Sequence, residues 1–204
     1  PRFTPSSVLS YATHPGWVMN YLFREKFALP NLSTHVSEGT NVAVSVADYF
    51  NTMLDQSMDW KMAEAIRAEW GGQFCLKGVM SVEDAKRAVD IGATAIMVSN
   101  HGGRQLDGSR SPFDQIAEIA DAVGGKIDII CDGGVRRGTH VLKALAAGAT
   151  ACSGGRLYLY ALAAAGEPGV DRVVGKLRDE IERGMKLIGV RSVAELDSSM
   201  LRWL

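Results

Sequence analysis

The sequence has few cysteines, almost no net charge and no long apolar run. Twenty-two Lys and Arg residues nearly balance 23 Asp and Glu residues, which leaves a formal net charge of −1 at pH 7. Because a basic excess is missing, the electrostatic case for nucleic acid is absent, and no nucleic-acid partner is expected. No apolar segment reaches the roughly 18 residues that a membrane-spanning helix requires.

The three cysteines are too few and too far apart to form a metal site or a disulfide framework. Cys75, Cys131 and Cys152 each lie in an apolar run, without the spacing of metal ligands. We therefore expect all three to be small buried hydrophobic residues of a protein in a reducing cytoplasm, and we expect no metal.

From residue 73 onward, short apolar runs alternate with amphipathic helical patterns. The runs cover residues 74–78, 94–100, 127–134 and 150–155. Ser81 and Ser111 are predicted to cap the helices that follow the first two runs. This alternation predicts parallel βα units in an α/β fold. Periodicity alone leaves an open doubly wound sheet possible, although no G-x-G-x-x-G turn follows a first strand.

The first 72 residues are less regular. Prolines and scattered aromatic side chains, such as Pro5, Pro15 and Trp17, predict short helices joined by extended connections. A longer helix is predicted from about Asp59 to Trp70, with Asp59 as its N-cap. With 204 residues and 47% hydrophobic content, the chain can bury a sizeable core, and one domain is the natural expectation.

Polar residues gather where the four apolar runs end. They are Lys77, then Ser99, His101 and Arg104, then Asp132 and Arg136, and finally Arg156. The carboxyl ends of parallel strands meet at one edge of a sheet, where loops and helix N-termini converge on ligands. Four such strand ends in succession predict a single site at that edge.

The last two loops combine glycine with arginine directly before a helix. They read "DGGVRRG" (132–138) and "SGGR" (153–156). Glycine permits close backbone approach, while a guanidinium and a helix N-terminus both favour an anion. In eight-stranded βα barrels a phosphate is often held by the loops after strands seven and eight. If these are those loops, the four runs are strands five to eight, and strands one to four would precede Pro1.

Lys77, His101 and Arg104 would then face whatever group the phosphate carries. Arginine offers a planar fork that matches a carboxylate, and histidine is the usual proton acceptor near neutral pH. These residue types predict removal of hydrogen from a small acid beside a phosphorylated cofactor. From the residues alone, flavin and pyridoxal phosphate both remain open, because a lysine can also form a Schiff base.

Several motifs resemble the FMN-dependent α-hydroxy-acid dehydrogenase and oxidase family, which includes lactate and mandelate dehydrogenases, glycolate oxidase and lactate oxidase. "LKG", "SNHGGRQLD", "DGGVRRG" and the "GR" of "SGGR" occur in the family's order and spacing. "RFTP" and "HPGWVMNYL" near the start are similar to the bacterial lactate and mandelate dehydrogenase branch. The resemblance implies a (β/α)8 barrel. Residues 1–204 would be the C-terminal part of this one domain, with 1–72 as the connection after strand four and 73–204 as strands five to eight.

The resemblance also assigns roles to individual residues. His101 resembles the catalytic base, and Arg104 the arginine that binds the substrate carboxylate. Lys77 resembles the lysine beside the pyrimidine edge of the flavin. Ser99 resembles a flavin contact, and Asp132 would accept a hydrogen bond from the ribityl chain. The residues expected to hold or line the phosphate site are Arg136, Gly155 and Arg156 with Gly133, Gly134 and Val135.

The implied activity is FMN-dependent oxidation of an L-2-hydroxy acid, with L-lactate to pyruvate as the first choice and mandelate or glycolate as alternatives. Electrons would pass from the reduced flavin to a quinone, a cytochrome or oxygen. A homotetramer is expected, in the cytoplasm or attached peripherally to the inner membrane. Two other readings stay open: another FMN barrel, such as a flavin-dependent isoprenoid isomerase, and a non-catalytic half-barrel.

Two departures from the family pattern stand out. The segment "ACSGGR" (151–156) is more polar than the aliphatic strand usual before that glycine–arginine pair. No stretch matches the family's second substrate arginine, its active-site tyrosines or the aspartate that orients the histidine. We therefore expect the chain to be the C-terminal part of a nicked or truncated enzyme whose N-terminal half-barrel is missing. Arg137 and His140 are predicted to have structural or surface roles.

Overall fold

A computed structural model of the chain describes residues 4–25 and 54–203. Its contacts divide the chain into two units, Pro1–Ser57 and Met58–Leu204, and each is described by itself. Much of the connection expected over residues 1–72 lies outside the described residues. The assignment of the whole chain to one barrel domain stays a prediction.

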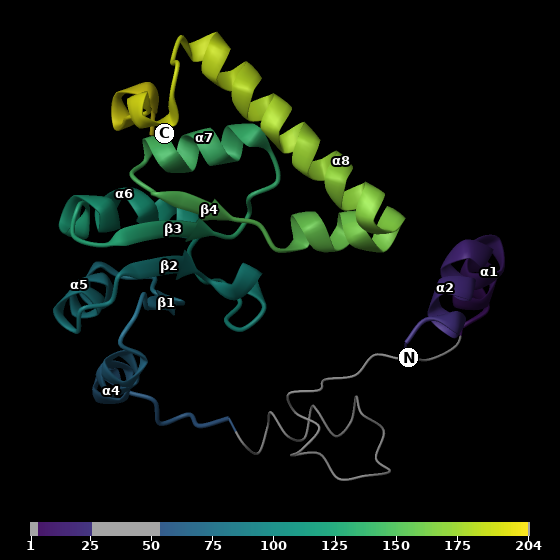
Figure 1. Ribbon diagram of the computed structural model, residues 1–204, viewed down its shortest axis with the longest axis horizontal. Coiled ribbons are helices and arrows are strands. Elements are labelled where there is room, and N and C mark those ends of the chain that lie inside the picture. The colour runs from purple at the N-terminus through teal and green to yellow at the C-terminus, as the bar shows by residue number, and fades with distance from the viewer. Residues whose placement is uncertain (1–3, 26–53, 204) are drawn as a thin grey trace. The chain divides into compact units, whose positions relative to one another are not determined.

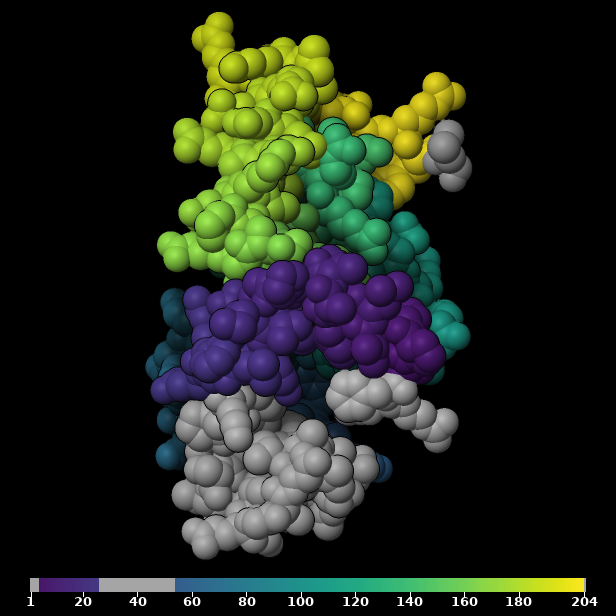
Figure 2. All heavy atoms as spheres, turned by 90° about the vertical axis from the view of Figure 1, so that its right-hand side faces the viewer, coloured from purple at the N-terminus to yellow at the C-terminus, as the bar shows by residue number. Residues whose placement is uncertain are grey.

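The described part of the first unit consists of two short helices, α1 (Pro5–Thr13) and α2 (Pro15–Phe23). Each begins with a proline, whose fixed φ suits the first helical position. Three aromatic rings stack in series along the pair, with centroids 5.7 Å apart for Tyr11 and Trp17 and 5.4 Å apart for Trp17 and Tyr21. The two helices pack against each other, as the space-filling view shows (Figure 2). The prediction of short helices in this region is confirmed for the described residues.

The second unit opens with α4 (Trp60–Trp70). Asp59 caps this helix, because its carboxylate accepts a hydrogen bond of 2.9 Å from the Met62 N–H. The helix ends at Gly71, which adopts the left-handed conformation with φ 67°. Both predicted ends of this helix are confirmed.

The rest of the unit is a four-stranded parallel sheet with strand order β1-β2-β3-β4 (Figure 1). The strands are β1 (Cys75–Lys77), β2 (Ala95–Ser99), β3 (Asp128–Asp132) and β4 (Ala151–Ser153). The helices between them are α5 (Val82–Asp90), α6 (Pro112–Val123) and α7 (Gly138–Ala146). All four apolar runs are therefore strands. Ser81 caps α5 with a 3.1 Å hydrogen bond from the Asp84 N–H, whereas the Ser111 side chain precedes α6 without a capping bond.

The core lies on one face of this sheet. Alternate strand residues such as Ile96, Val98 and Ile129 are at most 1% exposed and pack against apolar residues of α5, α6 and α7. Residues on the opposite face, such as Met97 and Ile130, are only half-buried. A doubly wound sheet carries helices on both faces and reverses its strand order. Helices on one face and a sequential order instead define part of a (β/α) barrel, and this confirms the predicted fold.

The chain continues from β4 into α8 (Arg156–Ile188). The helix is interrupted at Ala165 and Gly166, where Gly166 takes φ 64°, and Pro168 follows two residues later. No residue of α8 is buried. Two short 3-10 turns, Val193–Glu195 and Ser198–Met200, complete the unit. A helix directly after the "SGGR" loop was predicted, whereas its interruption was not.

The expectation that all three cysteines are buried is wrong for Cys75. Cys131 is buried and Cys152 is partly buried, and burial raises their thiol pKa values to about 12 and about 11. Cys75 is exposed. The reason is strand alternation. Leu76 points toward the helices that cover the core, so Cys75 and Lys77 lie on the opposite face of β1, which pairs with β2 alone among the described strands.

The one-sided core makes a prediction about stability. In the full-length protein, Ile129→Ala should lower the free energy of unfolding by about 2–5 kcal/mol, because it opens a cavity beneath the helices. Val174→Ala, at a position 47% exposed on α8, should cost less than about 1 kcal/mol. Urea unfolding followed by circular dichroism measures both. Equal losses would contradict this placement of the core.

Candidate functional site

Each of the four strands contributes one polar side chain to a connected network at the carboxyl edge of the sheet. Lys77 Nζ donates to Ser99 Oγ at 2.8 Å and to Asp132 Oδ2 at 3.1 Å. Ser99 Oγ donates to the same carboxylate oxygen at 2.5 Å. Ser153, the register partner of Asp132 on β4, also forms a side-chain hydrogen bond with Asp132. Because the four strands are parallel and their ends lie side by side, these side chains form one polar cluster.

Asp132 is the negative centre of this network. Burial raises the pKa of Asp132, but hydrogen bonds from Ser99, Ser153 and Lys77, together with the Lys77 charge, outweigh it and hold the pKa below its usual range. The Asp132 side chain is 15% exposed, whereas that of Lys77 is 50% exposed. Asp132 is thus a carboxylate at neutral pH, and the Lys77 ammonium beside it is open to a ligand.

The loop after β2 has an unusual backbone. His101, Gly102 and Gly103 have φ values of 57°, 67° and 72°, so three consecutive residues lie in the left-handed region. The His101 N–H donates to Ser99 Oγ at 3.2 Å, which ties this turn to the polar network. A non-glycine residue held at positive φ is typical of functional sites. The His101 imidazole has no hydrogen-bond partner among the described residues.

The loop after β3 turns through two glycines with positive φ, Gly133 at 133° and Gly134 at 72°. A Cβ at Gly133 would lie 3.0 Å from Pro112 Cγ, so the loop passes close to the start of α6. His140 Nδ1 lies 3.1 Å from the Gly134 carbonyl oxygen and 3.2 Å from the Arg136 N. His140 therefore contacts the backbone of this loop, which agrees with its predicted structural role.

Arg156, at the start of α8, joins the loops after β2 and β4. Its guanidinium donates to the Gly102 carbonyl oxygen. A Cβ at Gly102 would collide with the same guanidinium, so this contact requires glycine. The first glycine of "SNHGGRQLD" is therefore required by a contact with a residue 54 positions away in the chain.

These residues enclose one cavity of about 540 Å³ at the carboxyl edge of the strands. Its lining contains the predicted Lys77, His101, Arg104, Asp132, Gly133, Gly134, Val135, Arg136, Gly155 and Arg156. Ser99 is the one predicted site residue that does not line the cavity. It forms hydrogen bonds with Lys77 and Asp132, which do line it. Residues not predicted for the site are Gly102, Ser153, Leu157 and Leu159. The polar character of "ACSGGR" was the available signal for Ser153.

The lining is chemically suited to a phosphorylated cofactor. Lys77, Arg104, Arg136 and Arg156 bring four positive charges, whereas Asp132 is the only acidic residue among the described residues that line this cavity. Around Gly155 there is open space where a Cβ would stand, so an anion can approach the backbone there. A volume of about 540 Å³ lies within the range of small-molecule and cofactor sites. The residues therefore fit a group that carries a phosphate and a polar chain.

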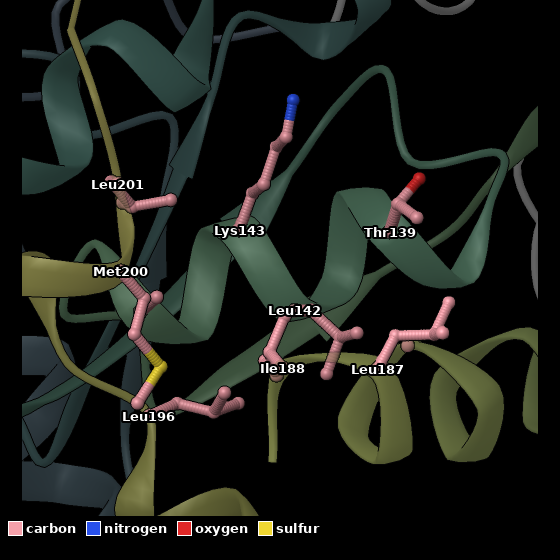
Figure 3. A pocket seen from close by; sticks show the side chains of 10 residues that line it. Thr139, Leu142, Lys143, Leu187, Ile188, Leu196, Met200 and Leu201 are labelled. Carbon is pink, nitrogen blue, oxygen red and sulfur yellow. The ribbon is translucent and has the colours of Figure 1, made fainter. Parts of the chain in front are cut away.

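A second cavity, of about 270 Å³, has a different character (Figure 3). It lies between α7, the end of α8 and the C-terminal segment, and its lining is mostly aliphatic. Lys143 is the one charged residue among the described residues of this lining, and in Figure 3 its side chain points away from Leu142 and Ile188. The described lining contains no acid, histidine or second cation that could transfer a proton or bind a phosphate.

Comparison with known proteins identifies the protein family to which the chain belongs. The profile of the FMN-dependent dehydrogenase family matches residues 1–203, and the chain belongs to this family. The chain is 41% identical over 189 residues to an L-lactate dehydrogenase of Alcaligenes faecalis, covering 92% of this chain and 50% of the relative. It is 39% identical over 202 residues to an L-lactate dehydrogenase of Pseudomonas paraeruginosa, covering 98% and 53%. The chain spans about half the length of the curated relatives it matches.

Solved structures of similar proteins support the same family. The structure of the monotopic membrane protein (S)-mandelate dehydrogenase matches with a TM-score of 0.86 and 35% identity over 98% of this chain and 52% of that one. A mandelate oxidase with benzoyl-formic acid matches with a TM-score of 0.65 and 47% identity over 67% and 41%. A mutant of mandelate oxidase is described with an FMN adduct. The predicted family, its barrel fold and FMN as the family's cofactor are confirmed.

The lowered pKa of Asp132 makes a prediction about acid stability. A carboxyl with a depressed pKa stabilises the fold above its unfolded pKa near 3.8, and this contribution disappears as pH falls through the lower folded pKa. Wild type should therefore be more stable than Asp132→Asn at neutral pH, and the difference should shrink below about pH 4. Denaturant titrations across this range test it. A difference that grows on acidification would contradict the assignment.

Proposed function

We propose that the protein containing this chain oxidises a small L-2-hydroxy acid with FMN as the oxidant, and that L-lactate is the substrate and pyruvate the product. The observation that carries the proposal is the meeting of Lys77, His101 and Arg104 in one cavity that also holds the glycine–arginine loops. The curated L-lactate dehydrogenases that resemble the chain support lactate. Mandelate is the second candidate, because mandelate enzymes are among the similar solved structures.

In this proposal, two side chains act on the substrate. The Arg104 guanidinium pairs with the carboxylate and thereby orients the α-carbon toward His101. The His101 imidazole, which is free of other partners among the described residues, takes the proton from the α-carbon in a carbanion route or from the hydroxyl in a hydride route. The strained turn holds the imidazole at the cavity, so little reorganisation is needed before proton transfer.

Other side chains would hold the cofactor. FMN, when bound, supplies the acceptor for the two electrons that leave the substrate. Lys77, kept in place by Ser99 and Asp132, would put a positive charge beside the pyrimidine edge of the flavin. Asp132 would accept a hydrogen bond from the ribityl chain. The phosphate would lie among Arg136, Gly155, Arg156 and the loop residues Gly133, Gly134 and Val135.

The electron acceptor would be a quinone, a cytochrome or oxygen, and the assembly a homotetramer. One similar structure is described as a monotopic membrane protein, which supports peripheral attachment to a membrane. Helices α1 and α2 also expose large apolar side chains, among them Leu9, Leu22 and Phe23 at 63–77%. Among the described helices, none has the length and apolarity needed to cross a bilayer.

Flavin reduction tests the proposal. Under anaerobic conditions, L-lactate should bleach the flavin absorbance of the full-length protein. His101→Ala should slow this bleaching by about 10²–10⁴-fold, because the proton acceptor is lost, while flavin content stays unchanged. Arg178→Ala on α8, which removes a surface pair with Glu182, should bleach like wild type. Bleaching by (S)-mandelate but not L-lactate would select the second candidate, and full activity of His101→Ala would contradict the assignment.

Arg104 should affect substrate binding rather than cofactor binding. Arg104→Met keeps the side-chain length but removes the guanidinium that would pair with the substrate carboxylate. The value of kcat/KM should therefore fall by at least about 100-fold. Steady-state kinetics with the acceptor in excess measures the change, and the absorbance ratio of protein to flavin checks the cofactor. A loss of flavin with unchanged kcat/KM per flavin would assign Arg104 to the cofactor instead.

A further inference from the structure

The loop after β3 is held from outside the cavity by a carboxylate on α8. Arg137 Nε donates to Glu180 Oε1 at 2.8 Å and to Oε2 at 2.9 Å. The Gly138 N–H, at the start of α7, donates to Glu180 Oε2 at 2.8 Å. One carboxylate thus holds two consecutive residues of "DGGVRRG", across a separation of 42 to 43 residues in the chain.

The packing at this point leaves no room for a side chain on Gly138. A Cβ there would lie 2.6 Å from Glu180 Cβ and 2.6 Å from the Ile181 N. Glycine therefore allows the first turn of α7 to lie directly against α8. Because α7 begins here, the position of Gly138 determines where the preceding residues, Gly133 to Arg136, enter the cavity.

Glu180 pairs with Arg137 and leaves the adjacent Arg136 available to a ligand. Arg137 is paired with Glu180, whereas Arg136 lines the 540 Å³ cavity and its side chain forms no hydrogen bond or ion pair with another described residue. Arg136 borders a smaller cavity of about 390 Å³ as well, whose lining includes Arg137, Lys176 and Glu180. Without the carboxylate, two arginines and a lysine would meet there with no negative charge, and their mutual repulsion would act on the loop.

The carboxylate is ionised under ordinary conditions. Hydrogen bonds from the Arg137 side chain and the Gly138 backbone, together with the charges of Arg137 and Arg183, hold the pKa of Glu180 below its usual range. A negative charge at the N-terminus of α7 also compensates the helix dipole there. The N-terminus of α7 is therefore occupied by the protein's own anion, and the cofactor phosphate is left to Arg136, Arg156 and the glycine amides.

We propose that Glu180 is a positioning residue for the cofactor phosphate: through Arg137 and Gly138 it holds residues 133–136 in the shape that binds this group. The proposal rests on FMN binding as proposed above. It adds a residue of α8 that does not itself line the 540 Å³ cavity and that acts by holding the loop after β3 in place.

The test compares two flavins and two variants. FMN and riboflavin share the ring and ribityl chain, but riboflavin lacks the phosphate. For apoprotein of the full-length protein, Glu180→Gln should weaken FMN binding by roughly three- to tenfold and leave riboflavin binding unchanged, because charge-assisted hydrogen bonds to the loop are weakened. The control is Glu182→Gln, which removes a carboxylate of the same helix that pairs with Arg178 at 3.0 Å. Quenching of flavin fluorescence measures both affinities.

Hydrogen–deuterium exchange gives a second readout that needs no cofactor. Amides of residues 134–138 should exchange faster in Glu180→Gln than in wild type or Glu182→Gln. Equal weakening of FMN and riboflavin would show a general loss of stability and overturn the inference, as would unchanged affinity for both. If wild type binds FMN and Glu180→Gln binds it equally well, only this inference fails. If wild type binds no FMN, the proposed function fails with it.

Discussion

The parallel register of four short strands is the constraint on which the rest of the structure depends. It places Lys77, Ser99, Asp132 and Ser153 at one edge, where they share hydrogen bonds around a single carboxylate. A shift of one strand by one residue would turn its polar side chain toward the helices and its apolar side chains away from them. The apolar packing under α5, α6 and α7 therefore protects the site, because it opposes such a shift.

The loops that line the cavity are joined by hydrogen bonds to this edge of the sheet and to one another. Ser99 links the network to the left-handed turn at His101, and Arg156 links that turn to the start of α8. On α8, Glu180 accepts hydrogen bonds from Arg137 and Gly138, which end the loop after β3. Cations and glycines consequently surround one cavity, and the His101 imidazole and the Arg104 guanidinium also line it. This arrangement gives a physical reason for the chemistry of the FMN-dependent dehydrogenase family to which the chain belongs.

Much of the fold could be predicted from the sequence, because local patterns of residues determine where the strands and helices begin and end. Apolar runs closed by polar residues marked all four strands, and Asp59 and Ser81 marked two helix starts through their capping bonds. Other features depend on contacts between distant residues, for which the sequence has no local signal. The exposure of Cys75 follows from which face of β1 meets the helices, and the pairing of Arg137 with Glu180 joins residues 43 positions apart. Ser153 was visible as an unexpected polar residue, but its contact with Asp132 required the register.

A crystal structure of the full-length protein with FMN and a substrate analogue would show whether Lys77, His101 and Arg104 serve one flavin and one substrate. We expect the flavin ring within hydrogen-bond distance of Lys77 and its phosphate between Arg136 and Arg156, with His101 and Arg104 facing the bound analogue. A flavin bound elsewhere, or a phosphate remote from both arginines, would contradict it.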